Sequence, residues 1–153
     1  MTNVQKLHIR DFETLEHLLG DFSALQSLTS LDMHRMYSDV KELATIGSLR
    51  KLEHLTLRGR LWWPGDDEED PEEPPWNGLT SFTSVRQLQL IGVYYTYNLL
   101  ESFAGLTQLT YLSVAPDTRN ASSPTESDIA HLSPLSSLQH LHMHVTYEVT
   151  VWV

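Results

Sequence analysis

A short hydrophobic motif recurs six times along the chain and constrains its fold more than any other feature. The motif reads L-x-x-L-x-L, with Val, Ile or Met at some apolar positions, and its copies begin at residues 4, 28, 52, 85, 109 and 138. Successive copies are 24, 24, 33, 24 and 29 residues apart, so a 24-residue unit carries one insertion of nine residues and one of five. Units of this length cannot bury their own apolar faces, so they must stack on one another.

Each unit is predicted to contain a strand followed by a loop and a helix. The L-x-L part of the motif has the period of two of a strand, whereas apolar residues recur every third or fourth position in residues 40–49, 100–106 and 129–135. That second spacing predicts a helical or 3₁₀ segment. Helix starts are expected at four side-chain acceptors, the last two of which have an acid three residues further on: Asp11, Ser38, Asn98 (with Glu101) and Thr125 (with Asp128).

The repeated motif resembles that of the leucine-rich repeat family over essentially the whole chain. The resemblance implies an α/β fold, a right-handed open solenoid with a parallel concave β-sheet and helices or 3₁₀ segments on the convex side, and a usual role in protein binding. One family position differs, because the Asn or Cys three residues after the last L is replaced by Phe12, Met36, Arg60, Val93, Asp117 and Thr146. We therefore expect one domain over residues 1–153 without a ladder of buried asparagines.

The two ends of the repeat array need cover for their apolar surface and strand edges. Residues 141–153 alternate between apolar and polar types, which predicts that the last strand continues into a hairpin or an edge strand. Two alternatives stay open at this point. In the first, the chain is a fragment of a longer array. In the second, its terminal strands pair with those of another copy of the chain in self-association.

Composition excludes several classes of protein. The chain has 153 residues, 20 acids against 10 bases, a formal net charge of -10 and no cysteine. This charge argues against nucleic acid or an anionic membrane as a partner, and the lack of cysteine excludes disulfides and thiolate chemistry. Because the sequence shows neither a secretory leader nor an apolar run of membrane-spanning length, we expect a cytoplasmic protein.

The strand residues that point away from the core are expected to line the concave face. In the first three units they are rich in Lys, Arg and His, and six of the eight histidines of the chain fall on this face, which also includes Asp32. Such a patch suits an acidic or aromatic segment of a protein partner; the alternative is a polar surface without a partner. The candidate partner-binding residues are Lys6, His8, Arg10, His34, His54, Arg58, Gln87, Gln89, Tyr111, His140, His142 and His144.

A second candidate for partner binding is an acidic loop inserted at residues 62–76. Seven acids lie within residues 66–73, and without them the chain has 13 acids against 10 bases. A loop of this kind can attract a basic partner, although a solvated insertion without a function explains it equally well. It lacks the alternating ligand spacing of a calcium loop. The loop residues assigned to partner binding are Trp62, Trp63, Asp66, Asp67, Glu68, Glu69, Asp70 and Trp76.

The sequence gives no sign of an enzyme or a cofactor. It contains no G-x-S-x-G, no H-E-x-x-H and no glycine-rich phosphate loop. His140, His142 and His144 share one strand face and are weak candidates for a metal site, because no acid occupies the matching positions of the preceding unit. We therefore predict a non-enzymatic protein-binding module acting as an inhibitor, an adaptor or a substrate-recognition unit. The alternatives are a histidine-based metal-binding protein and a structural spacer in a longer repeat array.

Overall fold

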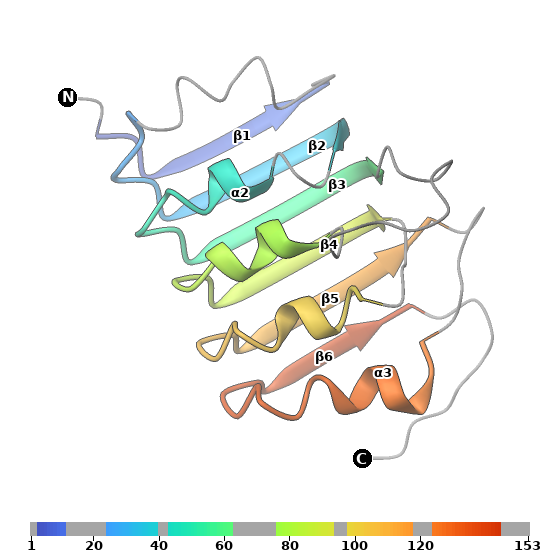
Figure 1. Cartoon of the computed structure of the whole chain (residues 1–153). Helices are drawn as coiled ribbons and strands as arrows, with labels where there is room; N and C mark the ends of the chain where they lie inside the picture. Colours follow the sequence, from blue (N-terminus) through green and yellow to red (C-terminus); the bar gives the residue numbers. More distant parts are fainter. Residues whose placement is uncertain are drawn as a thin grey trace.

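The structure is a computed structural model that describes residues 3–11, 24–39, 43–62, 76–93, 98–117 and 124–144. Each copy of the motif forms a strand, as the period of two predicts. The six strands pair in chain order in one open parallel sheet (Figure 1). Their bounds are β1 Lys6–Arg10, β2 Ser30–Asp39, β3 His54–Trp62, β4 Gln87–Val93, β5 Tyr111–Pro116 and β6 His140–Met143.

The register of the sheet follows the repeat without a shift through the motif. Leu7 pairs with Leu31, Leu31 pairs with Leu55, and the same row continues to the last strand. Residues at equal positions in their units are therefore cross-strand neighbours. Residues of one type that recur at the same position of successive units therefore lie in a row across the sheet.

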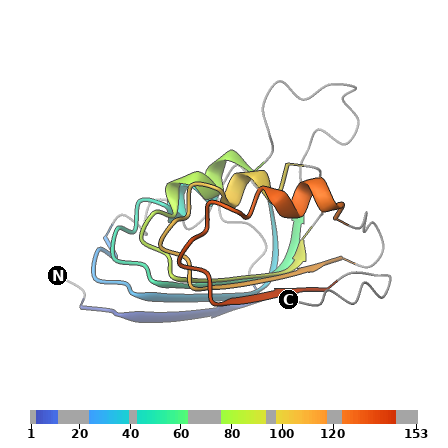
Figure 2. The same ribbon diagram turned by 90° about the horizontal axis from the view of Figure 1, so that it is seen from below.

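The described helical segments all lie on one face of the sheet (Figure 2). They are short, as expected for connections within so small a unit: α2 Leu43–Ile46, η4 Asn77–Ser81, η5 Glu101–Phe103 and α3 Glu126–Ala130. The buried apolar residues of α2, η4 and η5 and most of the motif leucines form one core, which also holds Trp76 and Phe82. The α3 segment contributes no buried residue. Met36 and Val93 belong to this core as well. At two units, apolar side chains thus replace the asparagine that the resemblance leads one to expect.

Hydrogen bonds between backbone groups link the units along the edge where the strands begin. Thr29 N donates to Gln5 O (2.8 Å), and Glu53 N donates in turn to Thr29 O (2.9 Å). The series continues through Arg86, Thr110 and Gln139 with distances of 2.8–2.9 Å. Backbone groups that precede the strands are thereby satisfied without an asparagine side chain.

The strands bend where a residue adopts a left-handed backbone conformation two positions after the motif. This residue has a φ of 57° at Asp11, 57° at Arg35, 152° at Gly59 and 80° at Gly92. The register shifts between His34 and Met36, and beyond this point β2 and β3 turn toward the helices (Figure 2). Glycine adopts such a φ without a steric penalty, whereas Asp and Arg do so at a cost of roughly 1–2 kcal/mol each.

Of the four expected helix starts, one is confirmed and two are wrong, while the helix expected after Asp11 lies outside the described residues. Thr125 caps α3, and the side chains of Thr125 and Asp128 exchange hydrogen bonds with each other's backbone amides. Ser38 was wrongly predicted, because it lies inside β2, whose pairing with β3 continues to Asp39. Asn98 does not cap a helix either; η5 begins after Leu100, and the Asn98 carbonyl accepts hydrogen bonds from Ser102.

The last unit is the least enclosed of those described. Leu141 of β6 is 45% exposed, whereas the matching Leu112 of β5 is fully buried. The predicted continuation of the last strand into residues 145–153 lies outside the described residues. Among the described residues, no helix is long and apolar enough to cross a membrane.

Candidate functional site

The face of the sheet opposite the described helices (Figure 2) is called the open face here. Three rows of residues that alternate with the motif residues of the core belong to this face. The rows follow the sheet register: Lys6–Ser30–His54–Gln87–Tyr111–His140, His8–Asp32–Thr56–Gln89–Ser113–His142, and Arg10–His34–Arg58–Ile91–Ala115 with His144 after β6. All twelve residues predicted to bind a partner lie in these rows, and each is at least partly accessible to solvent. The period of two thus places them on one surface.

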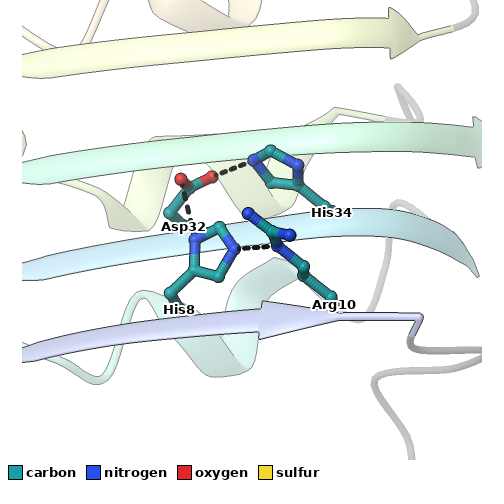
Figure 3. A network of polar contacts seen from close by, with 4 residues as sticks. All are labelled: His8, Arg10, Asp32 and His34. Atoms are coloured by element: carbon teal, nitrogen blue, oxygen red, sulfur yellow. Dashed lines mark hydrogen bonds and ion pairs between the residues drawn. The ribbon is translucent and has the colours of Figure 1, made fainter.

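A polar network joins β1 and β2 on the open face (Figure 3). Asp32 lies at its centre, as the direct cross-strand partner of His8. Asp32 Oδ2 is 3.0 Å from His8 Nδ1, and Arg10 Nε donates a hydrogen bond to His8 Nε2 (2.7 Å). Because Nε2 accepts this bond, the proton of a neutral His8 ring lies on Nδ1 and is donated to Asp32.

The second contact of Asp32 has a different character. Its other oxygen, Oδ1, lies 2.9 Å from His34 Nε2, and the two side chains come from the same strand (Figure 3). Both atoms are shielded from solvent, yet neither has a hydrogen-bond partner with suitable geometry. The His8 and His34 rings lie with their centroids 4.8 Å apart, tilted by 58°. Two imidazoles and one carboxylate therefore converge within a small volume.

An ion pair lies beside this network. Arg35 Nη1 donates to Asp11 Oδ1 (2.6 Å), and both residues hold the left-handed conformation described above. The hydrogen bond and the charge of Asp11 raise the pKa of Arg35 above its ordinary value. Together with Arg10 and His34, the pair lines a cavity of about 300 Å³. Two strained residues at the rim of one cavity are typical of a functional site.

The histidines of β6 are not brought together in the same way. His140, His142 and His144 are exposed, and His140 contacts the Tyr111 ring at a centroid distance of 6.2 Å. Among the residues that the structure describes, the only group of three suitable metal-ligand atoms is that of His8, Asp32 and His34. The repeat spacing contains the signal for this group, because residues 8 and 32 are one unit apart.

The acidic loop falls largely outside the described residues, which resume at Trp76. Trp62 ends β3, while Trp63, Asp66, Asp67, Glu68, Glu69 and Asp70 lie in the part that is not described. Trp76 is only 1% exposed and packs in the core. It anchors the end of the loop and has no surface to offer a partner, which corrects its assignment to partner binding.

Comparison with known proteins shows that the fold is similar to that of a solved structure. No protein-family model matches the chain, and no curated protein matches it either. Among solved structures, the chain is similar to an internalin from Listeria monocytogenes with a TM-score of 0.50 and 17% sequence identity. The match covers 84% of this chain and 37% of the internalin chain, so the chain spans little more than a third of that protein. The open sheet of six parallel strands thus matches the fold of an internalin.

Proposed function

We propose that the chain is a leucine-rich repeat protein that acts as a non-enzymatic protein-binding module. Two findings support this assignment: the motif that recurs six times, and the similarity of the fold to an internalin. The proposed binding surface is the open face, which would be the concave face of a right-handed solenoid. A role as an inhibitor, an adaptor or a substrate-recognition unit fits such a module.

The observation that carries this proposal is the in-register arrangement of accessible side chains on the open face. Six strands present rows of outward residues, and none of the described helices covers them (Figure 2). Strand pairing already fixes the backbone that carries these side chains, so binding a partner requires little ordering of the backbone, which favours affinity. Repeat proteins use extended surfaces of this kind for recognition.

The chemistry of the open face indicates the kind of partner. The part formed by β1, β2 and β3 carries Lys6, Arg10 and Arg58, whereas β4 and β5 present neutral Gln87, Gln89 and Tyr111. We propose that an acidic segment of the partner contacts the first part and that an apolar or aromatic segment contacts the second. The acidic loop at residues 62–76 would add attraction for basic residues of the same partner.

A charge reversal on the open face tests this function. The wild-type chain is used to capture partners from a lysate of the source organism at two salt concentrations, and the captured proteins are identified by mass spectrometry. The double variant Lys6→Glu/Arg58→Glu should no longer capture these partners. A matched control is Arg50→Glu/Lys51→Glu, which makes the same change of charge at exposed residues off the open face, near the start of β3. The control should retain the same partners.

Circular dichroism spectra of both variants should match that of the wild type, which shows that the substitutions do not unfold the chain. Equal capture by the open-face variant and the wild type would contradict the proposal. Association of a captured partner, measured as a rate at several salt concentrations, tests the loop: deletion of residues 66–73 should slow association and weaken its dependence on salt, since the loop contributes long-range attraction. An unchanged association rate would mean that the loop does not take part in partner binding.

A further inference from the structure

Three side chains on β1 and β2 place metal-ligand atoms close together on the open face. They are His8 Nδ1, the Asp32 carboxylate and His34 Nε2, and these atoms all lie within 4.8 Å of one another (Figure 3). We propose that they form a binding site for a divalent transition-metal ion such as Zn²⁺ or Co²⁺. Imidazole and carboxylate groups are common ligands of such ions, and two His with one carboxylate is a known zinc ligand set.

The distances are close to those that metal coordination requires. Bonds of 2.0–2.2 Å place neighbouring ligand atoms around a tetrahedral ion about 3.3–3.6 Å apart. The two nitrogen–oxygen distances are slightly shorter and involve different oxygens of the carboxylate: His8 Nδ1 is 3.0 Å from Asp32 Oδ2, and His34 Nε2 is 2.9 Å from Asp32 Oδ1. Binding one ion with all three groups therefore requires the two rings to move apart slightly and the carboxylate either to turn or to bind the ion through both oxygens.

The contact between Asp32 and His34 is the second observation that points to a ligand. Asp32 Oδ1 and His34 Nε2 are removed from solvent and lie 2.9 Å apart as an ion pair, but neither atom forms a hydrogen bond of suitable geometry. Buried polar atoms without a hydrogen bond are uncommon in folded proteins. An ion between them would accept a lone pair from each atom and satisfy both.

The backbone holds this arrangement in place. His8 and Asp32 are direct partners in the β1–β2 pairing, and Asp32 and His34 are two residues apart on the same face of β2. Sites built on paired strands are more precisely positioned than sites on loops. His34 also lines the cavity of about 300 Å³ that Arg10, Asp11 and Arg35 enclose with it.

Arg10 opposes metal binding in this arrangement and gives the proposal a distinctive test. Its Nε donates to His8 Nε2, so the proton of the neutral ring lies on Nδ1. When Nδ1 binds an ion, the proton must move to Nε2, and Arg10 must turn away. The positive charge of Arg10 also repels a cation. Replacing Arg10 with a neutral residue should therefore tighten metal binding.

Titration of the full chain with Co²⁺, followed by its visible absorption, tests the site, with Zn²⁺ as a competitor. The wild type should bind one ion, and Asp32→Asn or His34→Gln should weaken binding about 10-fold or more. Arg10→Gln should tighten binding several-fold. The matched controls are His54→Gln and His142→Gln, which remove other histidines of the open face and should leave the affinity unchanged.

Three results would overturn the proposal. They are the absence of saturable Co²⁺ binding at millimolar metal, an affinity unchanged in both Asp32→Asn and His34→Gln, and a loss of binding in His142→Gln. Circular dichroism spectra establish that each variant is folded, and the two ligand variants act as independent tests. Because the titration needs no protein partner, its outcome is separate from that of the capture experiment.

Discussion

Leu88 and Leu141 occupy the same position in their repeat units, but only Leu88 is enclosed by neighbours on both sides. Leu88 is fully buried in β4, whereas Leu141 in β6 is 45% exposed. The free-energy cost of truncating a side chain depends on the contacts it loses and on the cavity it leaves. Two identical sequence positions therefore differ in their contribution to stability.

We expect Leu88→Ala to lower the free energy of unfolding by about 2–5 kcal/mol, because it creates a cavity in a closed part of the core. Leu141→Ala should cost about 1 kcal/mol or less, since much of this side chain is already in water. Chemical denaturation of both variants measures the difference. Equal losses would mean that the last unit is as tightly packed as the central ones.

The open-face residues could be predicted from the sequence because a strand alternates its side chains between two faces. The pairing of Asp32 with both His8 and His34 could not, although the unit length makes residues 8 and 32 neighbours. Side-chain contacts depend on rotamers and on the local twist of the strands, which a pattern of residue types does not specify. For the same reason, the ion pair between Asp11 and Arg35 could not be predicted from the residue pattern.

At the scale of elements, the strands were more predictable than the connections between them. Each strand is defined by a recurring apolar motif, whereas the expected helix start at Ser38 depended on one side chain and was wrong. Thr125 was right, and Asp128 completes its cap. Asn98 also has an acid three residues further on, Glu101, but it does not cap a helix. The same local signal is therefore right at one position and wrong at another, because the packing of the whole unit decides where a helix begins.

The bend at the end of the strands depends on the left-handed residue, and Gly59 is the most sensitive example. A Cβ added there would lie 2.3 Å from the Met36 carbonyl oxygen, and its φ of 152° disfavours a side chain. Gly59→Ala should lower the free energy of unfolding by about 1–3 kcal/mol. Gly105→Ala is the matched control, because a Cβ at that position would meet no atom within 4 Å.

Thermal and chemical unfolding of the two glycine variants would measure this effect. We expect Gly105→Ala to have little influence or to stabilise slightly, because it reduces the freedom of the unfolded chain. If Gly59→Ala proved as harmless as Gly105→Ala, the strand would not need a left-handed residue at its bend.

At the scale of the whole molecule, every strand that the structure describes pairs with the strands that precede and follow it in the chain. Stability in such an array is approximately the sum of the units and the interfaces between neighbours. The interior strands β3 and β4 have two complete interfaces, whereas the last described unit exposes Leu141 and Ile129. Local opening should therefore require less free energy at β6 than in the centre.

Amide hydrogen exchange measures this gradient. The backbone amides of β3 and β4 should exchange more slowly than those of β6, because opening the centre disrupts two interfaces and opening the edge disrupts one. Uniform protection across all six strands would instead indicate that the array opens only as a single cooperative unit.

The sequential strand order also determines how the molecule would respond to force. β1 and β6 lie at opposite edges of the sheet (Figure 1), so a load applied to the two ends of the chain acts on the outermost strand pairs first. Each detached 24-residue unit would release about 80 Å of extended chain, and the 33-residue unit about 110 Å. Under tension, the chain is therefore expected to lengthen in a series of steps, each of which corresponds to the unfolding of one repeat unit.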